Sequence, residues 1–214
     1  MTLPRTYTQF AVYETFAPTA LRGRTVLLAA SDELWRSDLP PVLAMECARL
    51  GAQLALAAPD RAVYQPVARD IVAYGRPVLE LDATTDTGSA TFGQRAAAAT
   101  VQRFERIDLL IAAGPDDDIG LTEAACEAMA AQGAGCAVLI ASPGHATAAQ
   151  SAVDKLHAAY YPRGVRINGV VTAEPAPDAS APSAQEAAWM AIFFASPAGA
   201  HLSGQCLSLH TFQL

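Results

Sequence analysis

Charged residues are scarce in this chain, and positive charge is the scarcer kind. Lysine and arginine together number 14 against 21 aspartates and glutamates, which gives a net charge of −7 over 214 residues. Such a surface repels the phosphates of nucleic acids and of anionic membranes, so neither is expected as a partner. Apolar residues make up 52% of the chain, more than one core of this size needs. The surplus predicts an oligomer.

Long apolar runs and paired cysteines are also missing. No run reaches the length of a membrane span, and residues 1–24 lack the continuous apolar region of a signal peptide. A cytoplasmic protein is therefore expected. The four cysteines stand singly and are predicted to be buried reduced thiols: Cys47, Cys126, Cys136 and Cys206. Asp116–Asp118 precede a helix, where acidic residues suit the helix dipole, so no metal is expected.

Apolar runs of strand length alternate with segments of helical periodicity along nearly the whole chain. Strands are predicted at residues 25–30, 53–58, 77–81, 107–112, 136–141, 163–171 and 204–209. This alternation predicts an α/β fold, a single Rossmann-like, doubly wound parallel sheet with helices on both faces. We assign residues 22–214 to this one domain. Residues 1–21 are assigned to an N-terminal tail, or to an arm that packs on a partner subunit.

The first strand–turn–helix unit lacks the glycines that line a dinucleotide site. No glycine occurs from Ala29 to Leu50, and the turn holds Asp32, Glu33 and Trp35 instead. In Rossmann folds, glycines let the backbone approach a pyrophosphate at the helix N-terminus. Side chains at this turn would block that approach, and carboxylates would repel the phosphates. No coenzyme is therefore expected.

Six stretches in order resemble the short-chain dehydrogenase/reductase family, and they are spread from residue 21 to residue 209. They are LRGRTVLL, ECARLGAQLAL, LDATTD, IDLLIAAG, PRGVRINGV and EAAWMAIFFASPAGAHLSGQCLSL. The resemblance implies a nicotinamide-dependent active site with a serine at the end of the fifth strand. A tyrosine then follows, with a lysine four residues beyond it. The tyrosine would transfer a proton, while the lysine would lower the tyrosine pKa and hold the nicotinamide ribose.

The chain departs from this family pattern at the residues that carry the chemistry. Ser142 stands at the strand end, but the spacing to Arg166 places the family's tyrosine on Ser142 itself and its lysine on Ala146. Ser151 and Lys155 form a Ser-x-x-x-Lys pair that is nine residues out of this register. Lys155 is therefore interpreted as a solvated lysine.

Four positions resemble remnants of the family's coenzyme contacts: Ser31, Asp32, Asp82 and Gly114. Asp82 follows the third strand, where an aspartate can equally cap the next turn. Gly114 ends the fourth strand without the asparagines of the family motif. These remnants do not make a coenzyme site, and NAD(P) is expected only if the main interpretation fails.

The first functional interpretation is therefore a pseudoenzyme. The chain would be a non-catalytic subunit that supports or scaffolds an active dehydrogenase or another pathway partner. It would form a homo-oligomer, or a hetero-oligomer with an active subunit. Pairing would use the apolar helix from Ala187 to Ser196 and the strand from Gln205 to Leu209.

The second interpretation is a non-redox enzyme, of isomerase, dehydratase or cyclase type, or a small-ligand-binding protein. Ser142 and His145 would then form an acid/base pair beside the emptied cleft. The alternative for these two residues is a capped helix start with a solvent-facing histidine. An NAD(P)-dependent oxidoreductase is ranked last.

Overall fold

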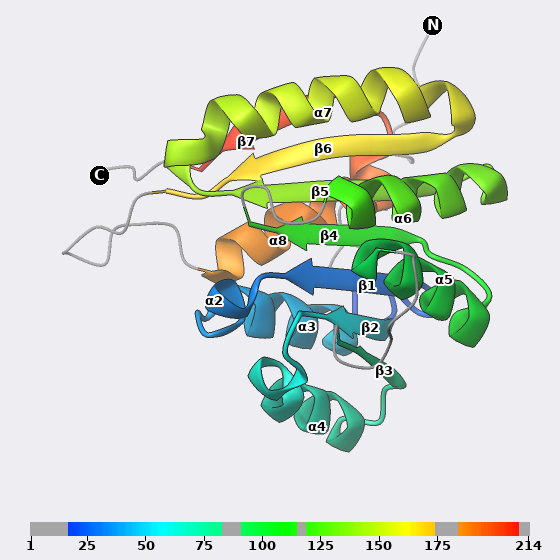
Figure 1. Cartoon of the computed structure of the whole chain (residues 1–214), viewed down its shortest axis with the longest axis vertical. Helices are drawn as coiled ribbons and strands as arrows, with labels where there is room; N and C mark the ends of the chain where they lie inside the picture. Colours follow the sequence, from blue (N-terminus) through cyan, green and yellow to red (C-terminus); the bar gives the residue numbers. More distant parts are fainter. Residues whose placement is uncertain (1–16, 83–90, 115–118, 174–183, 210–214) are drawn as a thin grey trace, which may run out of the picture.

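Seven parallel strands form one sheet in the order β3-β2-β1-β4-β5-β6-β7 (Figure 1). The computed structural model describes residues 17–82, 91–114, 119–173 and 184–209. The strands are β1 (Thr25–Ala30), β2 (Gln53–Ala57), β3 (Val78–Leu81), β4 (Leu109–Ala113), β5 (Gly135–Ala141), β6 (Val165–Val171) and β7 (Gln205–Ser208). The strand order reverses between β1 and β4, which defines a doubly wound fold and confirms the predicted fold class.

Helices cover both faces of the sheet (Figure 1). On one face lie α3 (Leu39–Arg49), α4 (Gln65–Ala73) and α8 (Ala184–Ala195), and on the other α5 (Phe92–Phe104), α6 (Ile119–Gln132) and α7 (Ala146–Tyr160). The short helix α2 (Asp32–Trp35) follows β1 directly. Single 3-10 turns complete the connections at Arg61–Val63, Pro143–His145, Tyr161–Arg163 and Pro197–Gly199. None of the helices in the described part of the chain has both the length and the apolar character that crossing a membrane requires.

Local sequence signals account for several helix starts. Proline occupies the first turn of α3 and of α4, where its missing N–H removes no helical hydrogen bond. Helix α5 begins with a capping box, in which Thr91 Oγ1 accepts from Gln94 N at 3.2 Å and Gln94 Oε1 accepts from Thr91 N at 3.1 Å. These caps satisfy backbone groups that would otherwise lack partners.

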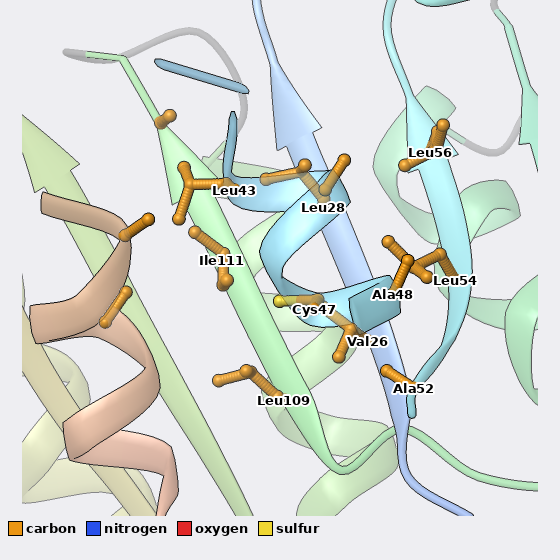
Figure 2. Close-up of a cluster of buried hydrophobic side chains, with 14 of the residues drawn as sticks. Val26, Leu28, Leu43, Cys47, Ala48, Ala52, Leu54, Leu56, Leu109 and Ile111 are labelled. Carbon is orange, nitrogen blue, oxygen red and sulfur yellow. The ribbon is translucent and has the colours of Figure 1, made fainter. Parts of the chain in front are cut away.

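The interior strands β1, β2, β4 and β5 are largely apolar because both faces of the sheet are buried there. Figure 2 shows the core on the α3 side, where Leu43 and Cys47 of α3 pack over alternate residues of β1, β2 and β4. Those strand residues are Val26, Leu28, Leu54, Leu56, Leu109 and Ile111. The intervening residues build a second core beneath α5, α6 and α7.

Helix α8 uses much of its apolar surface within the chain itself. Ala188, Ala191, Ile192 and Phe194 are fully buried, and α8 packs against α3. Trp189 keeps 45% of its surface exposed. The apolar character that predicted an interface helix is therefore partly explained by packing inside the monomer.

Part of the predicted arm packs on the domain. Leu21 is buried in the core on the α3 side, and its backbone N–H donates to the Leu50 carbonyl at 2.9 Å. Residues 1–16 lie outside the described part of the chain, so the interface role of the arm stays a prediction.

Gly93 allows α5 and α6 to approach closely. A larger residue at position 93 should therefore destabilise the fold. A Cβ at residue 93 would overlap the backbone of Leu121, whereas one at Gly144 would meet no atom within 4 Å. Gly93→Ala should lower the free energy of unfolding by about 1–3 kcal/mol, the usual cost of overpacking. Urea denaturation measures this, with Gly144→Ala as the matched control, expected within about 0.5 kcal/mol of the parent. Equal stability of the two variants would refute the close approach.

Candidate functional site

A pocket of about 430 Å³ opens where the carboxyl ends of β1, β2, β4 and β5 meet. It continues between the sheet and the helices α6 and α7. This edge includes the β1/β4 reversal point, where open α/β sheets bind their ligands. The volume and the mostly apolar lining are those of a small-molecule site.

The floor of the pocket is a row of three alanines and one leucine on adjacent strands. Ala57, Ala29, Ala112 and Leu139 are paired in register across β2, β1, β4 and β5. Two residues earlier on the same face, Leu27 and Leu110 are fully buried in the core beneath α5 to α7. The change from leucine to alanine along β1 and β4 leaves the space that becomes the pocket.

Ser142 and His145 are brought together at the end of β5. Ser142 Oγ and His145 Nδ1 are 2.8 Å apart, and the histidine tautomer decides which group donates. Both side chains are exposed, and His145 lines the pocket. The serine makes no side-chain cap to the 3-10 turn that follows it. Its hydroxyl is therefore paired with the imidazole, and the acid/base role of the two residues stays a prediction.

The turn after β1 is held by its own side chains. Ser31 Oγ accepts from Leu34 N at 3.3 Å, and Asp32 Oδ1 accepts from Asp60 N at 3.0 Å, which ties this turn to the end of β2. Leu34 lies against Gly114, where an added Cβ would come within 2.9 Å of the leucine Cδ1. Ser31 and Gly114 both line the pocket.

An aromatic pair occupies the α3 and α4 side of the same edge. Trp35 is 2% exposed, and its indole N–H donates to the Ala57 carbonyl at 3.1 Å. Its ring packs against Tyr64 with centroids 5.6 Å apart. Burial raises the pKa of Tyr64, and the negative charges of Asp82 and Glu80 raise it further. Asp82 thus lies near this aromatic pair, and it is not among the residues lining the pocket.

The fit of a dinucleotide differs between the two parts of this edge. The α2 end offers no phosphate cradle, because α2 has four residues, Ser31 already caps it, and Asp32 and Glu33 place negative charge in its first turn. The pocket side fits better, since Ser31, Pro59 and Gly114 border an open crevice at the reversal point.

Lys155 and Ser151 also line the pocket, which sequence spacing alone did not predict. Lys155 Nζ pairs with Glu123 Oε1 at 3.1 Å, and the two side chains are 70% and 42% exposed. This exposed pair links α7 to α6 beside the pocket. Alanines at three places on α7 also face the pocket: Ala148, Ala149 and Ala152. Their spacing, read together with the alanines that end β1 and β4, is the signal that could have revealed this site.

The described parts of the chain contain no candidate metal site and no reactive cysteine cluster. No cluster of three or more histidine, cysteine or acidic residues occurs there, and Asp116–Asp118 lie outside them. All four cysteines are free. Burial raises the pKa of Cys47 and Cys126 to about 12 and that of Cys136 to about 11.

These burial effects predict selective thiol labelling. Cys206 lies in β7 and is only partly buried, so it should react first with Ellman's reagent at pH 8. The other three thiols should react only as the chain unfolds, because neither the reagent nor a thiolate is favoured in the core. Cys206→Ser should remove the fast phase. A fast phase that survives this substitution would contradict the burial of the remaining cysteines.

Comparison with solved structures finds the same fold in several dehydrogenases. No protein-family model matches the chain, and a search of the curated proteins found no match. Among solved structures, a hydroxysteroid dehydrogenase from Escherichia coli is similar with a TM-score of 0.75 at 16% identity, over 94% of this chain and 100% of that one. A short-chain type dehydrogenase/reductase from Mycobacterium marinum gives 0.75 at 17% identity, over 91% and 96%. A 7α-hydroxysteroid dehydrogenase complexed with NADH and 7-oxo glycochenodeoxycholic acid gives 0.73 at 16%, over 88% and 93%.

The chain therefore has the short-chain dehydrogenase/reductase fold, which confirms the resemblance drawn from its sequence. The same comparisons correct the functional predictions. The three solved structures named above are dehydrogenases or reductases, and one of them is a complex with NADH. The predictions of a non-catalytic pseudoenzyme subunit and of no coenzyme are therefore wrong. They depended on missing motifs, whereas the crevice at the sheet edge comes from the topology and is present.

Proposed function

We propose that this chain is an oxidoreductase of the dehydrogenase/reductase type, with a nicotinamide dinucleotide bound at the sheet edge. The observation that carries the proposal is the pocket at the β1/β4 reversal point, in a fold shared with hydroxysteroid dehydrogenases. The dinucleotide would be held beside Ser31, Pro59 and Gly114, and it would supply the hydride chemistry. The substrate would be a small molecule with a hydroxyl or carbonyl group.

We assign the proton chemistry to Ser142 and His145. A reducible carbonyl gains a proton on its oxygen, and an oxidised alcohol loses one, so a proton-handling group must lie at that oxygen. Imidazole can do either, and its Nδ1 is held by Ser142 Oγ at 2.8 Å. Because His145 lines the pocket at the end of β5, the pair can exchange a proton with a substrate oxygen bound in the pocket. The family's tyrosine would thus be replaced by a serine–histidine pair.

We further propose a homo-oligomer in the cytoplasm. Its contacts would be the exposed part of α8 within residues 187–196, which includes Trp189, and the edge strand β7 within residues 205–209. Leu207 of β7 keeps 39% of its surface exposed, and among the residues that the structure describes β7 pairs only with β6. Four free cysteines suit a reducing compartment.

Coenzyme binding is the first test of this proposal. NADH or NADPH at a hundredfold excess over its dissociation constant should stabilise the fold by about 2.7 kcal/mol. For a chain of this size, that corresponds to a rise in Tm of several degrees. Differential scanning fluorimetry measures the shift, with ATP at equal concentration as the control for a nonspecific polyanion effect. No shift with either coenzyme at millimolar concentration would overturn the proposal.

The role of His145 is tested by substitution. His145→Gln should lower kcat for reduction of an uncharged cyclic ketone by about 10²–10⁴-fold, the usual contribution of a positioned acid or base. The coenzyme-induced rise in Tm should remain, because His145 is assigned to proton transfer. Ser142→Ala should lower kcat less and shift the pH–rate profile. His201→Gln, at an exposed histidine outside the pocket, is the matched control. Equal kcat in the two histidine variants would remove His145 from the mechanism.

A further inference from the structure

The pocket extends well beyond the sheet edge, into a space between α6 and α7. There its floor is formed by Ala29, Ala112 and Leu139, three residues paired in register across β1, β4 and β5. Its walls are apolar or small on both helices: Leu121 of α6 and Ala148, Ala149, Ala152 and Leu156 of α7. This part of the pocket, defined by these eight residues, is called the α6–α7 chamber.

The charges beside the chamber cancel. Lys155 and Glu123 pair across α7 and α6 at 3.1 Å, and both side chains reach solvent. Thr122 and Ser151 are the neutral polar residues next to them on the pocket lining. An anionic ligand would have to compete with Glu123 for the lysine, and a cationic one would have to compete with Lys155. The lining therefore selects an uncharged molecule.

The chamber also differs from the cores around it in its small side chains. Directly beneath its floor, Leu27 and Leu110 are fully buried by α5 to α7. Leu139 remains partly exposed although it lies in the interior strand β5 and faces the helices. Alanine on both strand and helix keeps the layers from closing here. An apolar surface held open in this way is suited to cover an apolar ligand.

We propose that the α6–α7 chamber binds an uncharged, apolar small molecule, the apolar body of the substrate. This inference deepens the proposed function, because the same pocket contains His145, which would face the reacting oxygen of such a molecule. The binding itself needs neither coenzyme nor catalysis. The chamber can therefore be tested independently of the oxidoreductase assignment.

The test uses N-phenyl-1-naphthylamine, an uncharged probe whose emission rises in apolar surroundings. Titration into the coenzyme-free chain should give saturable fluorescence. Ala112→Leu on the floor and Ala152→Leu on the opposite wall should each weaken probe binding at least tenfold, because the added carbons enter the chamber. Ala158→Leu is the matched control, on the exposed face of α7 outside the pocket, and should bind within twofold of the parent. Thermal unfolding verifies that each variant is folded.

Displacement of the probe tests the ligand class. 1-Decanol should displace the bound probe, and decanoate at pH 8 should need at least a tenfold higher concentration. Absence of saturable binding, unchanged binding in both filled variants, or equal displacement by the anion would each overturn the inference. Probe binding without any coenzyme-induced shift would instead reject the proposed oxidoreductase and leave the chamber intact. Coenzyme binding without probe binding would reject the chamber alone.

Discussion

The structure depends on a single parallel sheet that is buried on both faces. Because helices lie on either side of the interior strands, most residues of those strands must be apolar, and the register between strands decides which residues share a core. Because all seven strands are parallel, each connection crosses back before the next strand begins, and the carboxyl ends of the strands gather at one edge of the sheet. The pocket lies at this edge because polar turns and small side chains meet there.

The same constraint explains how the first turn can lose its glycines without loss of the fold. Trp35 fills the space next to β2 and donates its indole N–H to Ala57, while Asp32 accepts the backbone N–H of Asp60. These contacts join the ends of β1 and β2 through side chains. These side-chain contacts fix the conformation of the turn. The open crevice lies on the side of the turn that faces α6 and α7.

The fold was predictable from the sequence because it depends on signals within each segment. Strand-length apolar runs and helical periodicity gave the seven strands and the doubly wound order, and Ser142 and His145 were identified three residues apart. The pocket was not predictable in the same way, because its floor joins alanines from strands that are distant in the sequence. Lys155 is exposed, as expected of a solvated lysine, but its position on the pocket lining was missed for a related reason. The spacing to Arg166 compares positions along the sequence. Lys155 lies at the pocket because α7 packs beside α6, where Lys155 pairs with Glu123.

The functional error has a physical lesson. A glycine-rich turn and a tyrosine–lysine pair are particular ways of lining a crevice, and the crevice itself arises where the strand order reverses. Their absence removes known contacts but does not fill the space, because Ala29 and Ala112 still end the central strands with small side chains. Helix α7 here begins at Ala146, directly after the 3-10 turn that carries His145. This turn places the imidazole of His145 at the edge of the sheet where the pocket opens.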